Sequence, residues 1–163
     1  MKHMQIENNK RGGLLIEVLV SITVIVTALV FLLGMVVFSL RVHKLTEKNN
    51  IANSLAQEMI EAVRNFRDST DWNVNGLGTL TAGALYYPRK STDTPPKWIL
   101  DSGQETVNDF VRKVVFSNVN RDAIGNIVEI GGTNDPDTKK VTATVVWEEN
   151  SIEIVTYFTN WRD

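Results

Sequence analysis

The chain has 163 residues, a formal net charge of −2 and a hydrophobic content of 43%. A chain of this length accommodates one domain and one membrane segment, and its small negative charge argues against nucleic acid as the main partner. The chain contains no cysteine, which excludes disulfides, thiolate metal sites and a cysteine nucleophile.

The two ends of the chain carry opposite charge. The residues before Gly13 have a net charge of +2, and those from Arg41 onward have a net charge of −3. A short basic segment ahead of an apolar span favours an N-terminus in the cytoplasm, with the rest of the chain outside. Three bases just beyond the span, Arg41, Lys44 and Lys48, act against this orientation.

The segment from Val18 to Leu40 contains no charged residue and no proline in 23 positions. As a helix it measures about 30 Å, the thickness of the hydrocarbon core of a bilayer. It is too long for the core of a secretory signal peptide, and no small-x-small cleavage pattern follows it. An ordinary single-pass anchor accounts for this length but not for Glu17. A carboxylate inside a membrane costs about 2.5–3.5 kcal/mol, so we expect Glu17 to have a partner and a function.

Residues 10–19 have the sequence KRGGLLIEVL. This stretch resembles the N-terminal signal of the type IV pilin and pseudopilin family, in which a basic leader ends in glycine and a hydrophobic helix carries glutamate at its fifth mature position. The resemblance implies that prepilin peptidase cleaves between Gly12 and Gly13, that Gly13 is N-methylated, and that Glu17 occupies the fifth position. Gly13 stands where a large apolar residue is usual, which leaves a cut after Gly13 as an alternative. Gly34 stands where many major pilins have proline.

The resemblance also implies a structural role. A filament subunit leaves the bilayer and buries its helix against copies of itself, where the Glu17 carboxylate pairs with the terminal amine of a neighbour's Gly13 and sets the axial register. The implied partners are prepilin peptidase, other pilin or pseudopilin subunits and the inner membrane, with no cofactor and no small-molecule substrate. The chain is then a single-pass inner-membrane protein with a cytoplasmic N-terminus, and later extracytoplasmic in a pilus or pseudopilus. Residues 55–68 resemble the helix end of the minor-pilin, or pilus modification, branch.

The chain divides into three predicted segments. Apolar residues between Ala52 and Phe66 recur at intervals of three and four, which predicts an amphipathic helix over residues 41–68 that continues the apolar span from Leu14. The predicted segments are a leader at 1–12, the transmembrane or assembly half of the first helix at 13–40, and an extracytoplasmic globular domain at 41–163.

Residues 69–109 are predicted to be a connecting loop region, because they are rich in turn-forming Asp, Asn, Gly and Pro. Within this region, residues 85–87 are expected to form a short edge strand that Pro88 ends. Trp72 and Trp98 are expected to pack the loop on the helix rather than to bind a ligand.

Residues 110–161 are predicted to form an antiparallel sheet, since they are rich in Val, Ile and Phe and alternate apolar with polar side chains. A two-residue turn near Asn150 and Ser151 sets the register of the last hairpin. The predicted pairs are Trp147 with Ile154, Val145 with Thr156, and Ala143 with Phe158.

The predicted fold class is α+β and pilin-like, with one long N-terminal helix packed on a small antiparallel β-sheet. The membrane half of the helix is followed by an amphipathic half, whose apolar face docks on the sheet face that the hairpin pairs share. The docking residues are predicted to be Ala52, Leu55, Met59 and Val63.

The sequence predicts no enzyme, no catalytic residue and no metal site. The histidines are His3, in the leader, and His43, at the membrane border, and neither HExxH nor a glycine-rich phosphate loop occurs. The loop with Asp135 and Asp137 lacks the spacing of an EF-hand, so a turn is favoured over a calcium site.

Two functions from different classes remain open at this point. The first is a minor pilin or pseudopilin, and the second is an uncleaved single-pass anchor that holds a binding domain at the cell surface. The sequence does not separate a pilus from a secretion pseudopilus, or an initiator from a cap or shaft subunit.

Overall fold

A computed structural model of the chain describes the backbone of residues 5–161 and the side chains of residues 13–161. The leader predicted at residues 1–12 lies outside the residues whose side chains are described. The chain forms two compact units, residues 1–47 and residues 48–163. A single helix begins in the first unit and ends in the second, and the strands lie in the second unit.

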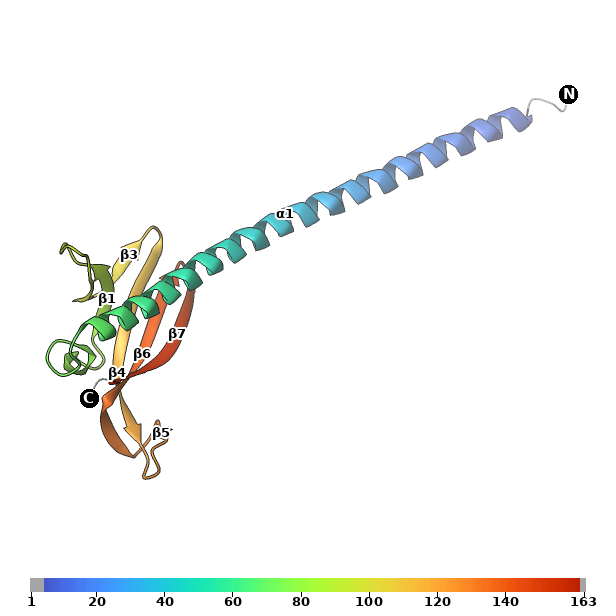
Figure 1. Cartoon of the computed structure of the whole chain (residues 1–163). Coiled ribbons are helices and arrows are strands. Elements are labelled where there is room, and N and C mark those ends of the chain that lie inside the picture. Colours follow the sequence, from blue (N-terminus) through green and yellow to red (C-terminus); the bar gives the residue numbers. More distant parts are fainter. Residues whose placement is uncertain (1–4, 162–163) are drawn as a thin grey trace. The chain divides into compact units, whose positions relative to one another are not determined.

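Helix α1 extends over Gln5–Ser69 (Figure 1). Between Leu14 and Ser69 the chain has no proline and one glycine, Gly34, so nothing removes a donor from the backbone hydrogen-bond ladder. At the C-terminus, the hydroxyls of Ser69 and Thr70 donate to the carbonyl oxygen of Phe66, at 3.2 and 2.7 Å. These bonds satisfy one of the carbonyls that a helix end leaves open. The predicted single long helix is confirmed.

The second unit contains one antiparallel sheet in the order β2-β1-β4-β6-β7, with β3 and β5 each paired to β4. A short 3-10 helix, η1 (Leu77–Thr79), precedes the first strand. The strands are β1 (Leu85–Lys90), β2 (Trp98–Ser102), β3 (Glu105–Val107), β4 (Phe110–Arg121), β5 (Ile127–Val128), β6 (Thr133–Trp147) and β7 (Asn150–Thr159). A helix packed on an antiparallel sheet confirms the α+β layout.

The core lies between the second-unit part of α1 and one face of the sheet. Ala52, Ala56, Met59 and Val63 of the helix are fully buried, and Leu55 is partly buried beside them. Burial of a side chain of the size of Met59 or Val63 contributes about 1.5–3 kcal/mol. The predicted docking face of the helix is therefore confirmed. Alternate residues of the central strands complete the core, and these are Phe110, Val114, Phe116, Val141, Ala143 and Val145.

The strand predicted at residues 85–87 is the beginning of β1, but residues 69–109 otherwise differ from the predicted connecting loop region, because β1 continues to Lys90 and β2 and β3 follow it. Pro88 lies inside β1, opposite Leu100 of β2, and does not end the strand. β1 pairs with β4 only through Leu85 and Tyr86. At Pro88 the strand therefore has a partner on one side only, where a residue without an N–H is tolerated. The turn-forming residues of this region indicated a loop. The strands form because their residues pair with one another and with β4, which lies further along the chain.

The register of the last hairpin also differs from the prediction. Trp147 lies opposite Asn150, Val145 opposite Ile152, and Ala143 opposite Ile154. The turn is at Glu148 and Glu149 rather than Asn150 and Ser151, and Glu148 adopts a φ of 49° there. Because the shift is an even number of residues, the side chains keep their faces. The predicted core face of the hairpin is therefore correct although its pairs are wrong.

A buried arginine joins the two layers of the second unit. Arg112 alternates with Phe110 and Val114 on the helix-facing side of β4, and its side chain is 9% exposed. Its Nε and Nη2 donate to Glu105 at 2.7 and 2.6 Å, and its Nη1 lies 3.4 Å from Glu58 of the helix. A buried guanidinium requires such partners, since an unpaired charge in a core is costly.

We predict that Glu105→Gln lowers the free energy of unfolding by about 1–2 kcal/mol, because it weakens a charge-assisted pair to a buried arginine. Urea denaturation of the full chain in detergent micelles, followed by tryptophan fluorescence, measures the change. The matched control is Glu61→Gln. Glu61 pairs with Arg64 at 2.9 Å on the exposed side of the helix, so its loss should cost less than about 0.5 kcal/mol. Equal losses in the two variants would contradict the buried role of Arg112.

An arm formed by residues 119–135 extends the sheet beyond a bulge in β6, and Figure 1 shows it at the β5 label. Nε of Arg121 donates to the Asp135 carboxylate at 2.6 Å, and the Thr138 hydroxyl donates to it at 2.7 Å. The Arg121 and Thr138 bonds lower the pKa of Asp135 below its ordinary value. Backbone donation from Asn126, at 2.8 Å, is the main cause that lowers the pKa of Asp122.

These two carboxylates predict a loss of stability in acid. A lowered pKa in the folded state means that the stabilisation is present above the unfolded pKa, about 3.9, and disappears as the pH falls through the folded pKa. The urea concentration at the midpoint of unfolding should therefore decrease when the pH drops below about 4. In Asp135→Asn this decrease should be smaller, because one of the two carboxylates is absent. Denaturation at a series of pH values between about 6 and 2 tests this, and profiles that run parallel for the two proteins would refute it.

Candidate membrane and assembly segment

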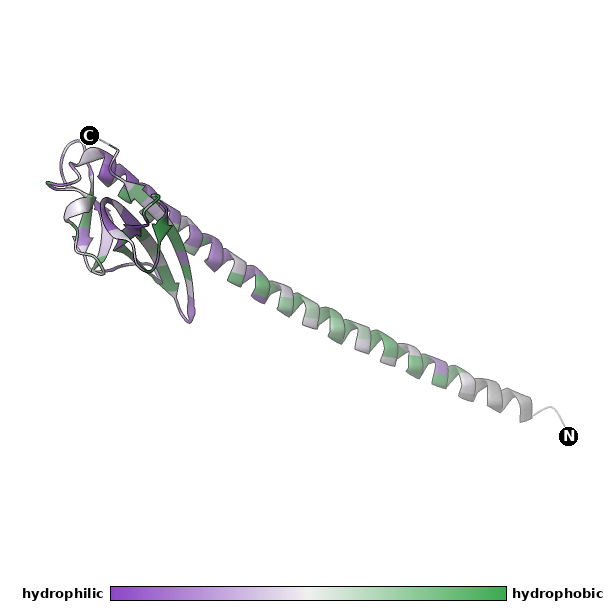
Figure 2. Ribbon diagram, turned by 90° about the horizontal axis from the view of Figure 1, so that it is seen from below, coloured by the Kyte–Doolittle hydropathy of each residue, from purple (hydrophilic) through white to green (hydrophobic). Residues whose placement is uncertain are grey.

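The described side chains of the first unit form an exposed apolar surface along α1. The large apolar side chains between Leu14 and Leu40 are 51–74% exposed. Figure 2 shows the hydrophobic colouring along this part of α1. Contiguous apolar surface of this extent is found where a protein meets lipid or another protein. The segment therefore requires an environment that the chain itself does not supply.

Within the described residues, α1 is the helix that is long and apolar enough to cross a membrane. Its most apolar stretch has a mean hydropathy of 2.8, and this stretch lies near the N-terminus with none of its residues buried. The length and composition are those of a single membrane-spanning helix.

Three hydroxyl side chains in this segment are satisfied within the helix. Ser21 donates to the carbonyl oxygen of Glu17 at 2.8 Å, Thr23 to that of Leu19 at 2.8 Å, and Thr27 to that of Thr23 at 2.9 Å. A hydroxyl that bonds to the preceding turn does not present an open donor to hydrocarbon. The hydroxyls of Ser21, Thr23 and Thr27 are therefore compatible with an apolar environment, whereas the carboxylate of Glu17 is a charged group in it.

Glu17 is the one charged side chain between Gly13 and Leu40, and it is exposed on the helix surface. It follows Gly13 by four residues, which places the two positions on the same helix face, one turn apart. Apart from the adjacent residues and the backbone of the same helix turns, no described atom lies within 4 Å of the position that a Cβ would take at Gly13 or Gly34. Packing within the chain therefore does not require glycine at either position. Gly12, on the other side of the predicted cut, lies outside the residues whose side chains are described.

The arrangement is a single carboxylate on an otherwise apolar cylinder. In lipid or in a packed helix bundle, an unpaired carboxylate is costly, and a cation or a hydrogen-bond donor from another molecule removes part of that cost. A carboxylate in this position can therefore pair with a positive charge on another molecule.

The loop considered for calcium has its carboxylates engaged by protein groups. Asp135 accepts from Arg121, Thr138 and the backbone N–H of Asp137, and Asp137 accepts from Asn160 at 3.2 Å. Among the described side chains, no group of three or more acidic or histidine residues is placed to hold a metal ion.

A second site in the structure was not anticipated from the sequence. A pocket of about 470 Å³ lies at the C-terminal end of α1, lined by Arg67, residues 69–73, Asn160 and Trp161. We call it the helix-end pocket. Its signal in the sequence is weak, because the polar cluster after α1 and the aromatic residue after β7 are far apart in the chain. Trp72, in contrast, is 6% exposed and packs in the core as predicted.

Comparison of the chain with protein-family models, with curated proteins and with solved structures found no match. The functional argument for the first unit therefore depends on its own residues. These are the glycine pair just before the apolar stretch of α1, the carboxylate at Glu17 and the exposed apolar surface that follows.

Proposed function

We propose that the chain is a minor pilin or pseudopilin, a structural subunit of a type IV pilus or a type II secretion pseudopilus. It is made with a leader and inserted in the inner membrane with its N-terminus in the cytoplasm. Prepilin peptidase then cuts between Gly12 and Gly13, and Gly13 is N-methylated. The observation that carries the proposal is the single carboxylate of Glu17 at the start of an apolar helix whose surface is uncovered.

The exposed apolar surface of the helix is suited to two successive environments, the membrane and the filament. In the membrane, lipid covers the side chains between Leu14 and Leu40, which are more than half exposed in the isolated chain. In a filament, the same side chains pack against helices of neighbouring subunits. The hydroxyls of Ser21, Thr23 and Thr27 bond to their own helix, which suits both environments because neither contains water.

Glu17 distinguishes a subunit from a plain anchor. In a bundle of apolar helices an unpaired carboxylate is costly, and a cationic partner removes most of that cost. The amine that cleavage creates at Gly13 of a neighbouring subunit is such a partner. Pairing then occurs only when the two helices stand at the correct axial offset, so the carboxylate acts as a register mark.

An uncleaved anchor with a surface binding domain is the rival proposal. It explains the length of the span, and the helix-end pocket in the second unit is the observation that favours it. It does not explain why glycine occupies positions 12 and 13 or why an acid follows four residues later. Processing of the N-terminus separates the two proposals directly.

The first prediction of the proposal concerns cleavage. Co-expression with a prepilin peptidase should yield a product that lacks residues 1–12 and begins at Gly13. Mass spectrometry of the intact protein measures the loss, and an extra methyl group on the product reports N-methylation. A product that begins at Leu14 would instead show that the cut follows Gly13.

The control is Gly12→Ala expressed with the same peptidase, together with the wild-type chain expressed without it. We expect both to keep residues 1–12. If the wild-type N-terminus stays intact in the presence of an active peptidase, and Gly12→Ala behaves in the same way, the uncleaved anchor is the correct interpretation.

The second prediction separates membrane insertion from assembly. Glu17→Val removes a carboxylate that opposes insertion by about 2.5–3.5 kcal/mol, so insertion should be unchanged or improved. Incorporation into filaments should fall by about tenfold or more, which corresponds to about 1.4 kcal/mol of lost pairing. Membrane fractionation and quantitative blotting of sheared filaments measure the two effects.

Glu17→Gln and Glu47→Gln are the matched variants for this test. Glutamine at position 17 keeps the size of the side chain and removes its charge, so incorporation should fall as with valine. Glu47 lies on the same helix beyond the apolar span, and its replacement should leave incorporation unchanged. Normal incorporation of both Glu17 variants would eliminate the role of the carboxylate in register.

A further inference from the structure

β7 forms one edge of the sheet in the second unit, and its outer side has no neighbouring strand. The strand order is β2-β1-β4-β6-β7, and Figure 1 shows β7 at the border of the sheet. Within residues 13–161, β6 is the one strand that pairs with β7. An edge strand keeps a row of backbone N–H and C=O groups that can pair with another chain.

The backbone groups on this outer side can be identified from the bonds to β6. In an antiparallel ladder, residues that bond to the neighbouring strand alternate with residues whose N–H and C=O point away from it. Asn150 faces Trp147 across the two-residue turn, and the N–H of Asn160 donates to the carbonyl oxygen of Asp137 at 2.8 Å. The even-numbered residues of β7 therefore bond to β6. The outward groups belong to Ser151, Glu153, Val155, Tyr157 and Thr159.

The two edges of the sheet differ in how they are protected from such pairing. β2, at the other edge, has five residues and follows Pro95 and Pro96, and Lys90 of its partner strand stands over the ring of Trp98. Short length, proline and lysine are features by which proteins block edge pairing. β7 has ten residues without proline, glycine, lysine or arginine, and its register with β6 is unbroken.

Apolar side chains flank the β7 edge on both faces of the sheet. Val155 and Tyr157 are 49% and 42% exposed, and they alternate with Ile152 and Ile154, which are partly buried against the core. A strand added beside β7 would cover apolar surface on both faces, as cross-strand neighbours do. The edge therefore offers side-chain contacts in addition to backbone bonds.

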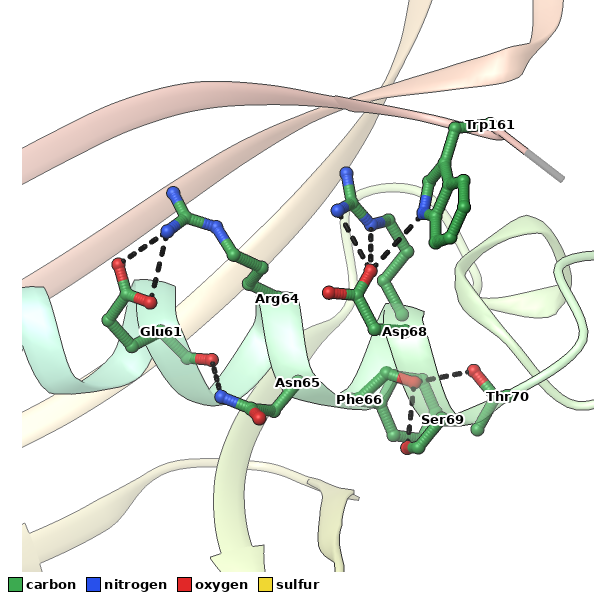
Figure 3. Close-up of polar contacts among 9 residues, drawn as sticks. Glu61, Arg64, Asn65, Phe66, Asp68, Ser69, Thr70 and Trp161 are labelled. Carbon is green, nitrogen blue, oxygen red and sulfur yellow. Dashed lines mark hydrogen bonds and ion pairs between the residues drawn. The ribbon is translucent and has the colours of Figure 1, made fainter.

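The described chain after β7 leads to the end of α1. β7 ends at Thr159, and Nε1 of Trp161 donates to Asp68 at 3.3 Å, a contact that Figure 3 shows beside the helix end. Glu153 lies six residues before Thr159, about 20 Å along an extended strand. The four residues after Thr159 span at most about 14 Å, so they do not reach Glu153.

The charge on the outer side of β7 is negative. Glu153 is the one charged residue of the strand, and it is exposed. The Thr144 hydroxyl of β6 donates to its carboxylate at 3.3 Å, which holds the carboxylate on the face away from the core. The base in the same row, Lys113, lies opposite Thr144 on β4, one strand further in. A cation opposite Glu153 would therefore come from an added strand.

We propose that β7 binds an extended segment of another protein as an added antiparallel strand. A basic residue of the segment lies opposite Glu153, and apolar residues lie opposite Val155 and Tyr157. In strand addition, main-chain hydrogen bonds supply the affinity and alternate side chains supply the specificity. A second copy of β7 is a poorer partner, because it brings another Glu153 and no base. The surface is separate from the cleavage motif and the apolar span, so this inference goes beyond the proposed function.

The test uses the full chain in micelles of an uncharged detergent and a fluorescein-labelled nine-residue peptide. The peptide consists of valine and threonine, with one lysine at the position that faces Glu153, and a second peptide has glutamate at that position. Fluorescence anisotropy measures both affinities, with empty micelles as the blank. We expect the lysine peptide to bind about fivefold more tightly than the glutamate peptide, and the difference should shrink in high salt.

A charge reversal tests the contact with Glu153. Glu153→Lys should invert the preference, so that the glutamate peptide binds more tightly than the lysine peptide. The matched control is Asp93→Lys, which makes the same change in charge at an exposed residue of the segment between β1 and β2. This control should keep the preference of the wild-type chain.

A proline variant tests the backbone bonds. Val155→Pro removes an outward N–H and leaves the bonds of its neighbours to β6, a position at which an edge strand tolerates proline. It should weaken binding by about tenfold or more, whereas Val155→Thr, which keeps the N–H, should bind within about twofold of the wild type. Peptides N-methylated on one edge or the other repeat this test without changing the chain, and methylation of the edge that faces β7 should abolish binding.

Hydrogen exchange of the outward amides shows whether the edge is open. The amides of Ser151, Glu153, Val155 and Tyr157 should exchange rapidly in the free chain and slowly with the lysine peptide bound. The proposal is overturned if these amides are already protected in the free chain, which would mean that a second copy or another segment covers the edge. It is also overturned if neither peptide binds, if Glu153→Lys keeps the wild-type preference, or if methylation of either peptide edge has the same effect.

Discussion

The apolar surface between Leu14 and Leu40 is the constraint to which the rest of the first unit is adapted. Its side chains are more than half exposed in the isolated chain, and water is a poor environment for such a surface. The hydroxyls of Ser21, Thr23 and Thr27 are bonded to the preceding turn, and Glu17 is the one charged residue of the span. A segment built in this way is stable only when lipid or other helices cover it.

In the second unit, apolar side chains are covered by other residues of the same unit. There α1 covers one face of the sheet with Ala52, Ala56, Met59 and Val63, all fully buried. The charge inside this core, Arg112, has carboxylates from both the helix and β3 as partners. Arg112 is buried and has its partners within the chain, whereas Glu17 is exposed and has its proposed partner on another molecule.

The proposed function places processing and assembly in the first unit, where they depend on the N-terminal glycines, Glu17 and the apolar span. The helix-end pocket lies in the second unit, where bonds between the loop after α1 and the sheet hold its walls.

The amino-acid sequence by itself determined the elements whose signals are local and periodic. An uninterrupted apolar run and intervals of three and four predicted α1 and its core face, and alternation predicted the faces of β6 and β7. Only the tertiary structure decided the pairing partners. β1 to β3 formed in a region rich in turn residues, Pro88 was accommodated by one-sided pairing, and the hairpin turn lay at Glu148 and Glu149. The helix-end pocket was hidden for the same reason, since its walls are separated by most of the second unit and meet only when the sheet forms.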